Sequence, residues 1–171
     1  MLPYCGRAEC PPICSFAKVT PNLPTSKTTS AQTLSRFATR VQRELGIAGE
    51  VNIGITSNRE MRTLNRTFRK KNKPTDVLSF PSVTPGVAGD IAISLEIAAE
   101  NAAELGHPLA TEVKILILHG MLHLAGYDHE IDEGEMHHRE ADLRRKLKLP
   151  VGLIERTHGP IAAPGKRRGR A

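Results

Sequence analysis

Three histidines with the spacing of metal ligands lie in the segment HGMLHLAGYDH, residues 119–129. His119 and His123 are four residues apart, so a helix would place both side chains on one face. Gly126 can adopt the left-handed backbone conformation that ends a helix and turns the chain back. His129 would then approach the same point from beyond the turn. Three imidazoles around one point leave a tetrahedral ion with a fourth, open position, which is typical of catalytic zinc sites.

The alternative interpretation is that these histidines are core residues satisfied by hydrogen bonds. Their number, their spacing and their place in the most apolar helical segment favour a metal site, because neutral histidine is the commonest metal ligand. We therefore predict one Zn²⁺ ion per chain, although imidazole also suits copper, iron and nickel. A further ligand such as Asp90 or Asp128 would close the fourth position and make the metal structural, and the sequence leaves that alternative open.

Gly120 indicates which reaction the histidine motif favours. The spacing matches the zinc motif of the metzincin proteases, but those carry a glutamate directly after the first histidine, where this chain has Gly120. In such proteases that carboxylate takes a proton from the nucleophilic water and delivers one to the leaving nitrogen, and glycine can do neither. Phosphodiester hydrolysis depends less on such a residue. It needs an activated oxygen nucleophile and positive charge facing an anionic transition state.

Positive charge is concentrated between Arg59 and Lys73, where seven basic residues accompany one acid. Four arginines at steps of three, four and three share one face of a predicted helix, and we call them the arginine stripe: Arg59, Arg62, Arg66 and Arg69. Such a stripe is usually a solvated face. No acid four residues away within the helix relieves its repulsion, however, which favours phosphate binding. The predicted nucleic-acid-binding residues are Arg59, Arg62, Arg66, Lys70, Lys71 and Lys73.

Hydrophobic periodicity predicts a single α+β domain, a small mixed β-sheet packed with helices and carrying the zinc site on a central buried helix. The predicted strands cover residues 50–56, 77–80 and 90–94. A first helix ends at Gly46, and Ser57 with Glu60 forms a capping box that opens the helix of the arginine stripe. Further helices are predicted over residues 95–105, 108–125 and 132–147, the second of them apolar nearly all round.

The ends of the chain differ from its middle. Residues 1–30 are rich in Pro, Ser and Thr and predict a loosely ordered arm rather than an organellar transit peptide, while residues 151–171 predict a basic tail after a domain over 31–150. The cysteines of the arm lack C-x-x-C pairing and are expected to be reduced thiols in a cytoplasmic protein: Cys5, Cys10 and Cys14. The longest strongly apolar run has four residues, which predicts no membrane span.

Two segments together closely resemble the bacterial YbeY endoribonucleases, also called rRNA maturation factors. One is LNRTFRKKNKPTDVLSFP, residues 64–81, and the other is the histidine segment; GDIAIS, residues 89–94, resembles the strand between them. The resemblance spans about residues 45–147. The N-terminal arm matches poorly, which leaves the first strand of the family uncertain, and the GKRRGR tail looks like an addition.

This resemblance implies a cytoplasmic, zinc-dependent, single-strand-specific endoribonuclease that acts in 16S rRNA 3′-end maturation and ribosome quality control. Its partners would be single-stranded RNA, precursor rRNA and the ribosomal small subunit. By the same resemblance, Arg69 is catalytic and the zinc ligands are His119, His123 and His129. Two alternatives stay open: a metzincin-like metallohydrolase of another substrate class, and a non-catalytic zinc-containing ribosome-binding factor.

Overall fold

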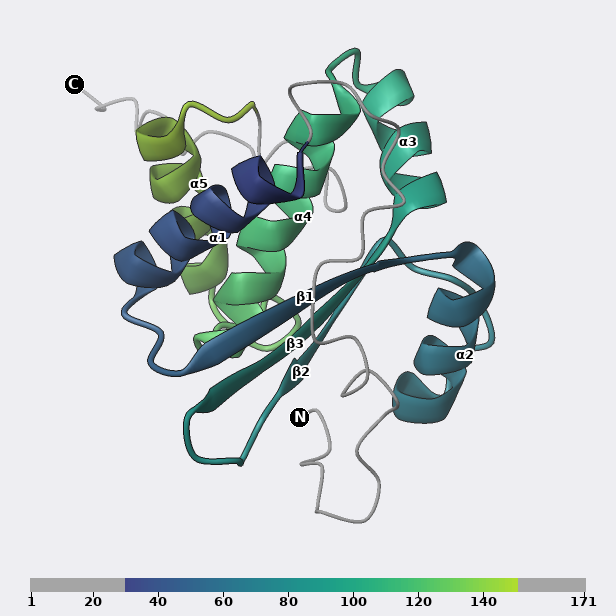
Figure 1. Ribbon diagram of the computed structural model, residues 1–171, viewed down its shortest axis with the longest axis horizontal. Helices are drawn as coiled ribbons and strands as arrows, with labels where there is room; N and C mark the ends of the chain where they lie inside the picture. Colours follow the sequence, from purple (N-terminus) through teal and green to yellow (C-terminus); the bar gives the residue numbers. More distant parts are fainter. Residues whose placement is uncertain (1–29, 151–171) are drawn as a thin grey trace, which may run out of the picture.

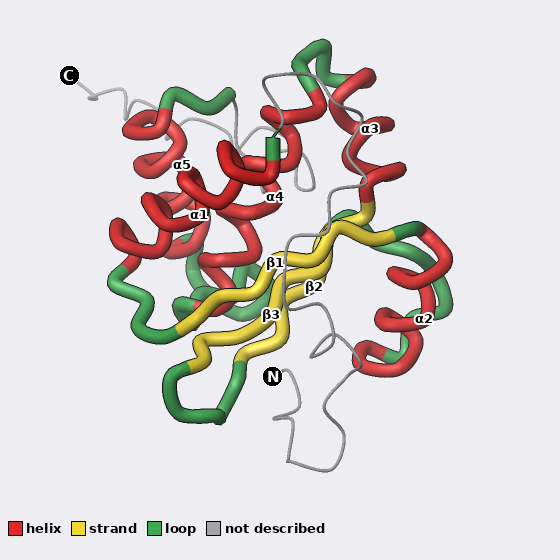
Figure 2. Tube along the Cα trace, in the orientation of Figure 1, coloured by secondary structure: helices red, strands yellow, loops and turns green. Residues whose placement is uncertain are grey.

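Helices lie on both sides of a three-stranded sheet in the computed structural model, which describes residues 30–150 (Figures 1 and 2). The elements follow one another as α1 (Ala31–Leu45), β1 (Glu50–Thr56), α2 (Asn58–Arg69), β2 (Val77–Pro81), β3 (Val87–Ser94), α3 (Leu95–Glu104), α4 (Leu109–Leu124) and α5 (Glu135–Leu147). The α+β class predicted from the sequence is confirmed. The cysteines, residues 1–29 of the predicted arm and the predicted tail lie outside the described residues.

The sheet is mixed, with β3 in the centre. Its strand order is β1-β3-β2; β1 runs parallel to β3 and β2 runs antiparallel to it. Alternate side chains of β3 face opposite layers: Ile91 belongs to the main core with α4, and Ala92 belongs to a smaller core with Met61 of α2. β3 begins at Val87, three residues before the predicted start, because Glu50 at the beginning of β1 pairs with Val87.

The central helix is α4, which is buried on nearly every side. Eleven of its residues are buried, and α1, α3 and α5 surround it on the face away from the sheet (Figure 1). A helix with apolar residues all round needs such a position, because no face of it is suited to water. The prediction of a central buried helix carrying the histidines is therefore confirmed. None of the helices in residues 30–150 is long and apolar enough to span a membrane.

Local signals set the ends of α2 and α5. The capping box of α2 is present: the Ser57 side chain accepts from the Glu60 N–H, and the Glu60 carboxylate accepts from the Ser57 N–H. α5 begins at Glu135, three residues later than predicted. The reason is that the Asp132 carboxylate accepts from the backbone N–H groups of Gly134 and Met136, so this residue precedes the helix instead of starting it.

Candidate metal centre

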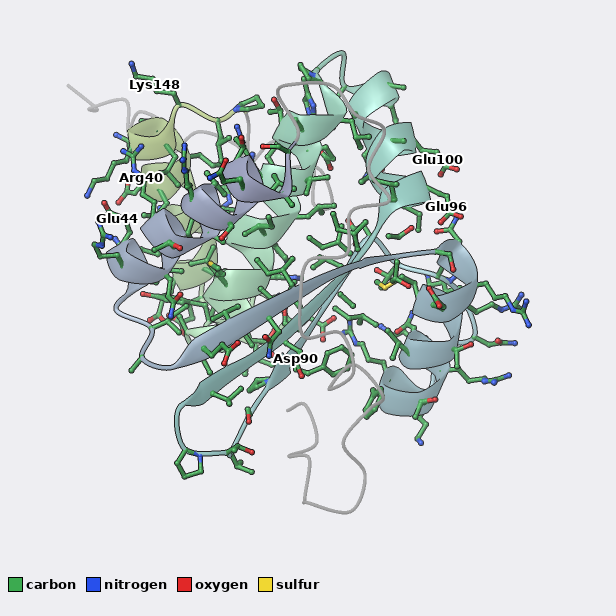
Figure 3. All side chains as sticks on the ribbon, viewed as in Figure 1. Arg40, Glu44, Asp90, Glu96, Glu100 and Lys148 are labelled. Atoms are coloured by element: carbon green, nitrogen blue, oxygen red, sulfur yellow. The ribbon has the colours of Figure 1, made fainter. Side chains whose placement is uncertain are left out.

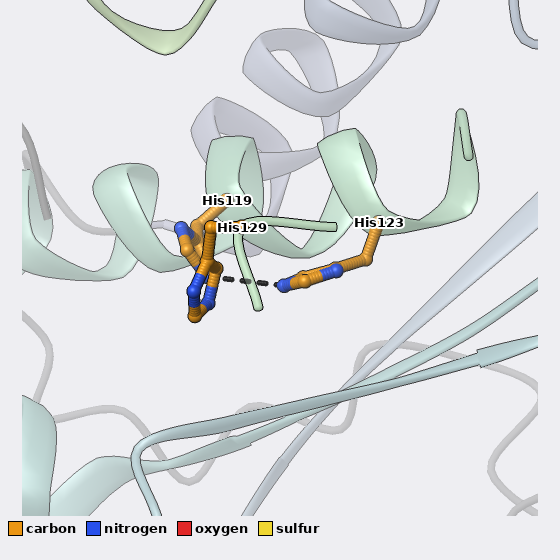
Figure 4. Close-up of side chains that lie close together, drawn as sticks. All are labelled: His119, His123 and His129. Carbon is orange, nitrogen blue, oxygen red and sulfur yellow. Dashed lines mark hydrogen bonds between the residues drawn. The ribbon is translucent and has the colours of Figure 1, made fainter. Parts of the chain in front are cut away.

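His119, His123 and His129 converge, as Figure 4 shows, two from the last turns of α4 and one from the loop beyond it. Each can offer a ring nitrogen within 4.8 Å of the others. Gly126 makes the convergence possible: its φ of 93° is in the left-handed region, so the chain reverses directly after α4. The backbone N–H of Tyr127 donates to Leu122 at 3.1 Å and holds the reversed chain against the helix.

The distance between His119 and His123 fits a metal ion. Their Nε2 atoms lie 3.3 Å apart and face each other. Two Zn–N bonds of about 2.0–2.1 Å at a tetrahedral angle would place their nitrogens about 3.3 Å apart. Two neutral imidazoles that both present lone pairs would repel at this distance, whereas a cation between them satisfies both. The donor set therefore fits zinc.

Electrostatics keep His123 in the form that binds metal. Burial, followed by the neighbouring charges of His119 and His129, lowers the pKa of His123 from 6.5 to about 4, against opposing contributions from Asp128 and a hydrogen bond at Tyr127. A metal ligand must be a neutral imidazole. At pH 7 His123 is therefore already deprotonated, and an arriving ion displaces no proton from it.

Neither carboxylate that would close the fourth position belongs to the convergent group, which within residues 30–150 consists of the three histidines. Asp90 lies on the central strand, labelled in Figure 3, and its Oδ1 accepts from Asn52 at 3.0 Å. The Oδ1 of Asp128 accepts from the backbone N–H of Glu130 at 3.1 Å. The geometry in the described part of the chain thus favours an open fourth position.

Gly120 faces the sheet and not the metal site. A Cβ atom at this position would lie 2.9 Å from Cγ2 of Ile91 and 3.0 Å from Oγ of Ser79. The same Ser79 hydroxyl donates to the Gly120 carbonyl at 3.0 Å and ties α4 to β2. There is no room here for the glutamate of a protease, because that place is filled by β2 and β3. The close helix–sheet contact accounts for the glycine.

The arginine stripe is divided between one paired residue and three exposed ones. Arg69 donates through Nη2 to Glu130 Oε1 at 2.8 Å, which links the end of α2 to the residue directly after His129. That hydrogen bond and the Arg69 charge lower the pKa of the Glu130 carboxyl. Arg59, Arg62 and Arg66 are exposed, as are Lys70, Lys71 and Lys73. In Figure 3 long side chains ending in nitrogen project from α2 into solvent.

The loop that carries the lysines is held by two residues from the middle of α2. Arg62 donates through Nε to Asn72 Oδ1 at 3.0 Å, and the buried Asn65 donates through Nδ2 to the Lys73 carbonyl at 2.7 Å. These bonds fold the loop back along the helix. The loop cations are therefore held beside the helix, and we call the exposed cations of both segments the basic patch: Arg59, Arg62, Arg66, Lys70, Lys71 and Lys73.

Sequence reasoning missed two carboxylates beside the site, Glu130 and Glu140. Glu140 Oε2 lies 3.1 Å from His119 Nδ1, and both side chains are buried. Residues 132–147 were expected to form a helix, and none of them was expected at the metal site. A signal was nevertheless present, since Met136, Glu140 and Leu143 recur at steps of four and three and mark a buried face.

The family profile described as "Endoribonuclease YbeY" matches residues 18–148. The chain belongs to the YbeY family. The match starts well before the region that carried the resemblance in the sequence, which began at about residue 45. It includes the complete histidine segment and the complete arginine stripe.

Similar proteins agree with the family assignment. Proteins named Endoribonuclease YbeY from Koribacter versatilis and Solibacter usitatus are 57% and 53% identical to this chain. The first alignment covers 82% of this chain and 93% of the relative, and the second covers 72% and 83%. The solution structure of a Thermotoga maritima protein superposes with a TM-score of 0.52 at 28% identity, covering 88% of this chain and 99% of that one.

Proposed function

We propose that this protein is a zinc-dependent endoribonuclease that hydrolyses single-stranded RNA. The observation that carries the proposal is the convergence of three imidazoles, with the Nε2 atoms of His119 and His123 at a zinc-like distance of 3.3 Å. Arg69 is held beside the loop that carries His129 by its ion pair with Glu130. Membership of the YbeY family, with relatives named as endoribonucleases, supports the reaction class. Gly120 disfavours the protease alternative, since the sheet occupies the place of the protease glutamate.

In this proposal His119, His123 and His129 hold the ion, and the buried helix α4 positions the first two of them. A bound zinc ion would supply Lewis acidity and a nucleophilic water of lowered pKa. The chain itself supplies the geometry. Glu140 Oε2 contacts His119 Nδ1, and burial lowers the pKa of His123 so that its ring is neutral at pH 7.

Arg69 is the residue we assign to the charge of the scissile phosphate. A guanidinium has five N–H donors in a planar fork, and Glu130 accepts one of them at 2.8 Å. The fork can contact two phosphate oxygens together, a geometry that lysine does not reproduce. Because Arg69 is anchored beside His129, a phosphate that it binds lies next to the metal ligands.

The basic patch would bind the phosphates that flank the cleaved bond. Its six cations lie on α2 and the following loop. Because they are exposed, they suit a flexible polyanion better than a pocket of a folded protein partner. Within this proposal the physiological substrates are precursor rRNA and the small ribosomal subunit, and the roles are 16S rRNA 3′-end maturation and ribosome quality control in the cytoplasm.

The test combines metal analysis with single-turnover cleavage of an end-labelled RNA, presented as a single strand and as a duplex. We expect about one zinc per chain, since the three histidines complete one site. Cleavage of the single strand should stop with a chelator and return with added zinc. His123→Ala should lose both metal and cleavage while keeping RNA binding. Zinc retention by that variant, or cleavage that a chelator does not affect, would refute the proposed site.

A further inference from the structure

A buried ion pair of α5 lies directly behind the histidine site. Glu140 and Arg144 are only 1% and 3% exposed, and His119 is 5% exposed. The Arg144 guanidinium donates through Nε to Glu140 Oε1 at 2.8 Å, and the other carboxylate oxygen, Oε2, lies 3.1 Å from His119 Nδ1. Arg144, Glu140 and His119 thus form a chain of contacts that ends at the ring whose other nitrogen faces His123.

We propose that Glu140 is a positioning residue that fixes the tautomer and the ring orientation of His119, and that Arg144 fixes Glu140 in turn. This inference rests on the metal site of the proposed function. A carboxylate can only accept, so His119 must carry its proton on Nδ1 and present the lone pair of Nε2 to the ion. The opposite tautomer would put a proton between His119 and His123, where it excludes a cation.

Arg144 determines which group of residue 140 can face it. It is a donor only and stays charged, so the group that faces it must be an acceptor. It also donates through Nη1 to the Pro150 carbonyl at 2.7 Å, which holds the guanidinium from its other side. A buried charge that loses its partner is costly. Arg144 therefore holds Oε1 of Glu140 as its acceptor, which leaves Oε2 facing Nδ1 of His119.

The substitution Glu140→Gln separates these effects because it is nearly isosteric. The amide has one acceptor oxygen and one donor nitrogen, and Arg144 requires the oxygen. The amide NH₂ must then face His119 Nδ1, which becomes an acceptor and moves the proton to Nε2. We expect zinc affinity to fall by about 10- to 100-fold, the usual effect of losing a partner behind a metal-bound histidine. Adding Arg144→Met frees the amide to turn its oxygen to His119, so the double variant should recover affinity.

The experiment measures zinc affinity by competition with a chromophoric chelator, and reads the His119 tautomer in the metal-free protein from side-chain ¹H–¹⁵N spectra. The matched control is Asp142→Asn, the same chemical change at an exposed carboxylate of α5 that pairs with Arg145. The control should leave both quantities unchanged. Thermal unfolding with chelator present identifies a temperature at which every variant is folded.

The results distinguish this inference from the proposed function. If Glu140→Gln binds zinc within about twofold of the parent, or keeps the His119 proton on Nδ1, Glu140 has only a structural role and the inference is overturned. If the parent protein binds no zinc, the proposed metal function fails, and the tautomer spectra still decide the role of Glu140 alone. Should the double variant not fold, the spectra of Glu140→Gln decide the matter.

Discussion

Gly120→Ala is expected to destabilise the protein, although alanine normally favours a helix. The helix-propensity gain is about 1 kcal/mol. Against it, the new methyl group would lie 2.9 Å from Ile91 Cγ2, 3.0 Å from Ser79 Oγ and 3.2 Å from Ile91 Cδ1. Ile91 is 0% exposed and lies on the central strand, and its Cγ2 is attached directly to the branched Cβ, so it cannot move aside.

The magnitude follows from these opposing effects. Overpacking a close-packed core costs about 1–3 kcal/mol. The net loss in the free energy of unfolding should then be at most about 2 kcal/mol, once the propensity gain of about 1 kcal/mol is subtracted from the overpacking cost. Urea unfolding of the metal-free protein measures it, and a displaced α4 should also weaken zinc binding.

A double-mutant cycle isolates the contact. Ile91→Ala removes the Cγ2 atom that the new methyl would meet, and alone it should cost about 2–5 kcal/mol as a large-to-small core change. Combined with Gly120→Ala, it should cost less than the sum, with a coupling of about 0.5–3 kcal/mol. A Gly120→Ala protein about 1 kcal/mol more stable than the parent, as helix propensity alone predicts, or strict additivity in the cycle, would refute the close approach of α4 to the sheet.

Three further outcomes are expected. Arg69→Lys should keep zinc and RNA affinity but slow single-turnover cleavage by about one to three orders of magnitude, whereas Arg62→Lys should change the rate little; equal rates for Arg69→Lys and the parent would remove Arg69 from the mechanism. The pKa of His123 is about 4 in the folded protein and 6.5 in the unfolded chain, so the unfolded chain binds more protons between these pH values. The free energy of unfolding of the metal-free protein should therefore fall as the pH drops from 6.5 to 4. The fall should be smaller in His123→Ala. Replacing Lys70, Lys71 and Lys73 of the basic patch together with glutamine should reduce the slope of log RNA affinity against log salt by about 2, roughly 0.7 for each charge that contacts a single strand. An unchanged slope would show that the basic patch is only a solvated surface.

The sequence was a good guide wherever the cause of a structure is local. The capping box of α2, the strand over residues 50–56 and the turn at Gly126 each depend on residues a few positions apart, and all three are present. The convergence of the histidines could be predicted equally well, because two of them are one helical turn apart and the third follows a tight turn. The spacing of the three histidines along the chain is therefore enough to predict that they converge.

The carboxylates around that site could not be predicted from the sequence in the same way. Glu130 is 61 residues from Arg69, and Glu140 is 21 residues from His119. Both pairs form only because α2 and α5 pack at particular angles against the site, and no short pattern encodes those angles. Gly120 posed a related problem, since its proximity to the sheet depends on the position of β3. The sequence suggested a lost catalytic group where the fold has a packing contact.

The ion pair between Arg69 and Glu130 places a negative charge beside the arginine that is proposed to bind phosphate. An anion that binds Arg69 therefore shares its guanidinium with Glu130, and the fold keeps this carboxylate there at a high effective concentration. A small monovalent anion makes no further contact that offsets the repulsion from Glu130. A polyanion does, because each further phosphate can contact another cation of the basic patch. The length of an anionic chain, and not merely the sign of its charge, therefore decides how well it binds beside Glu130.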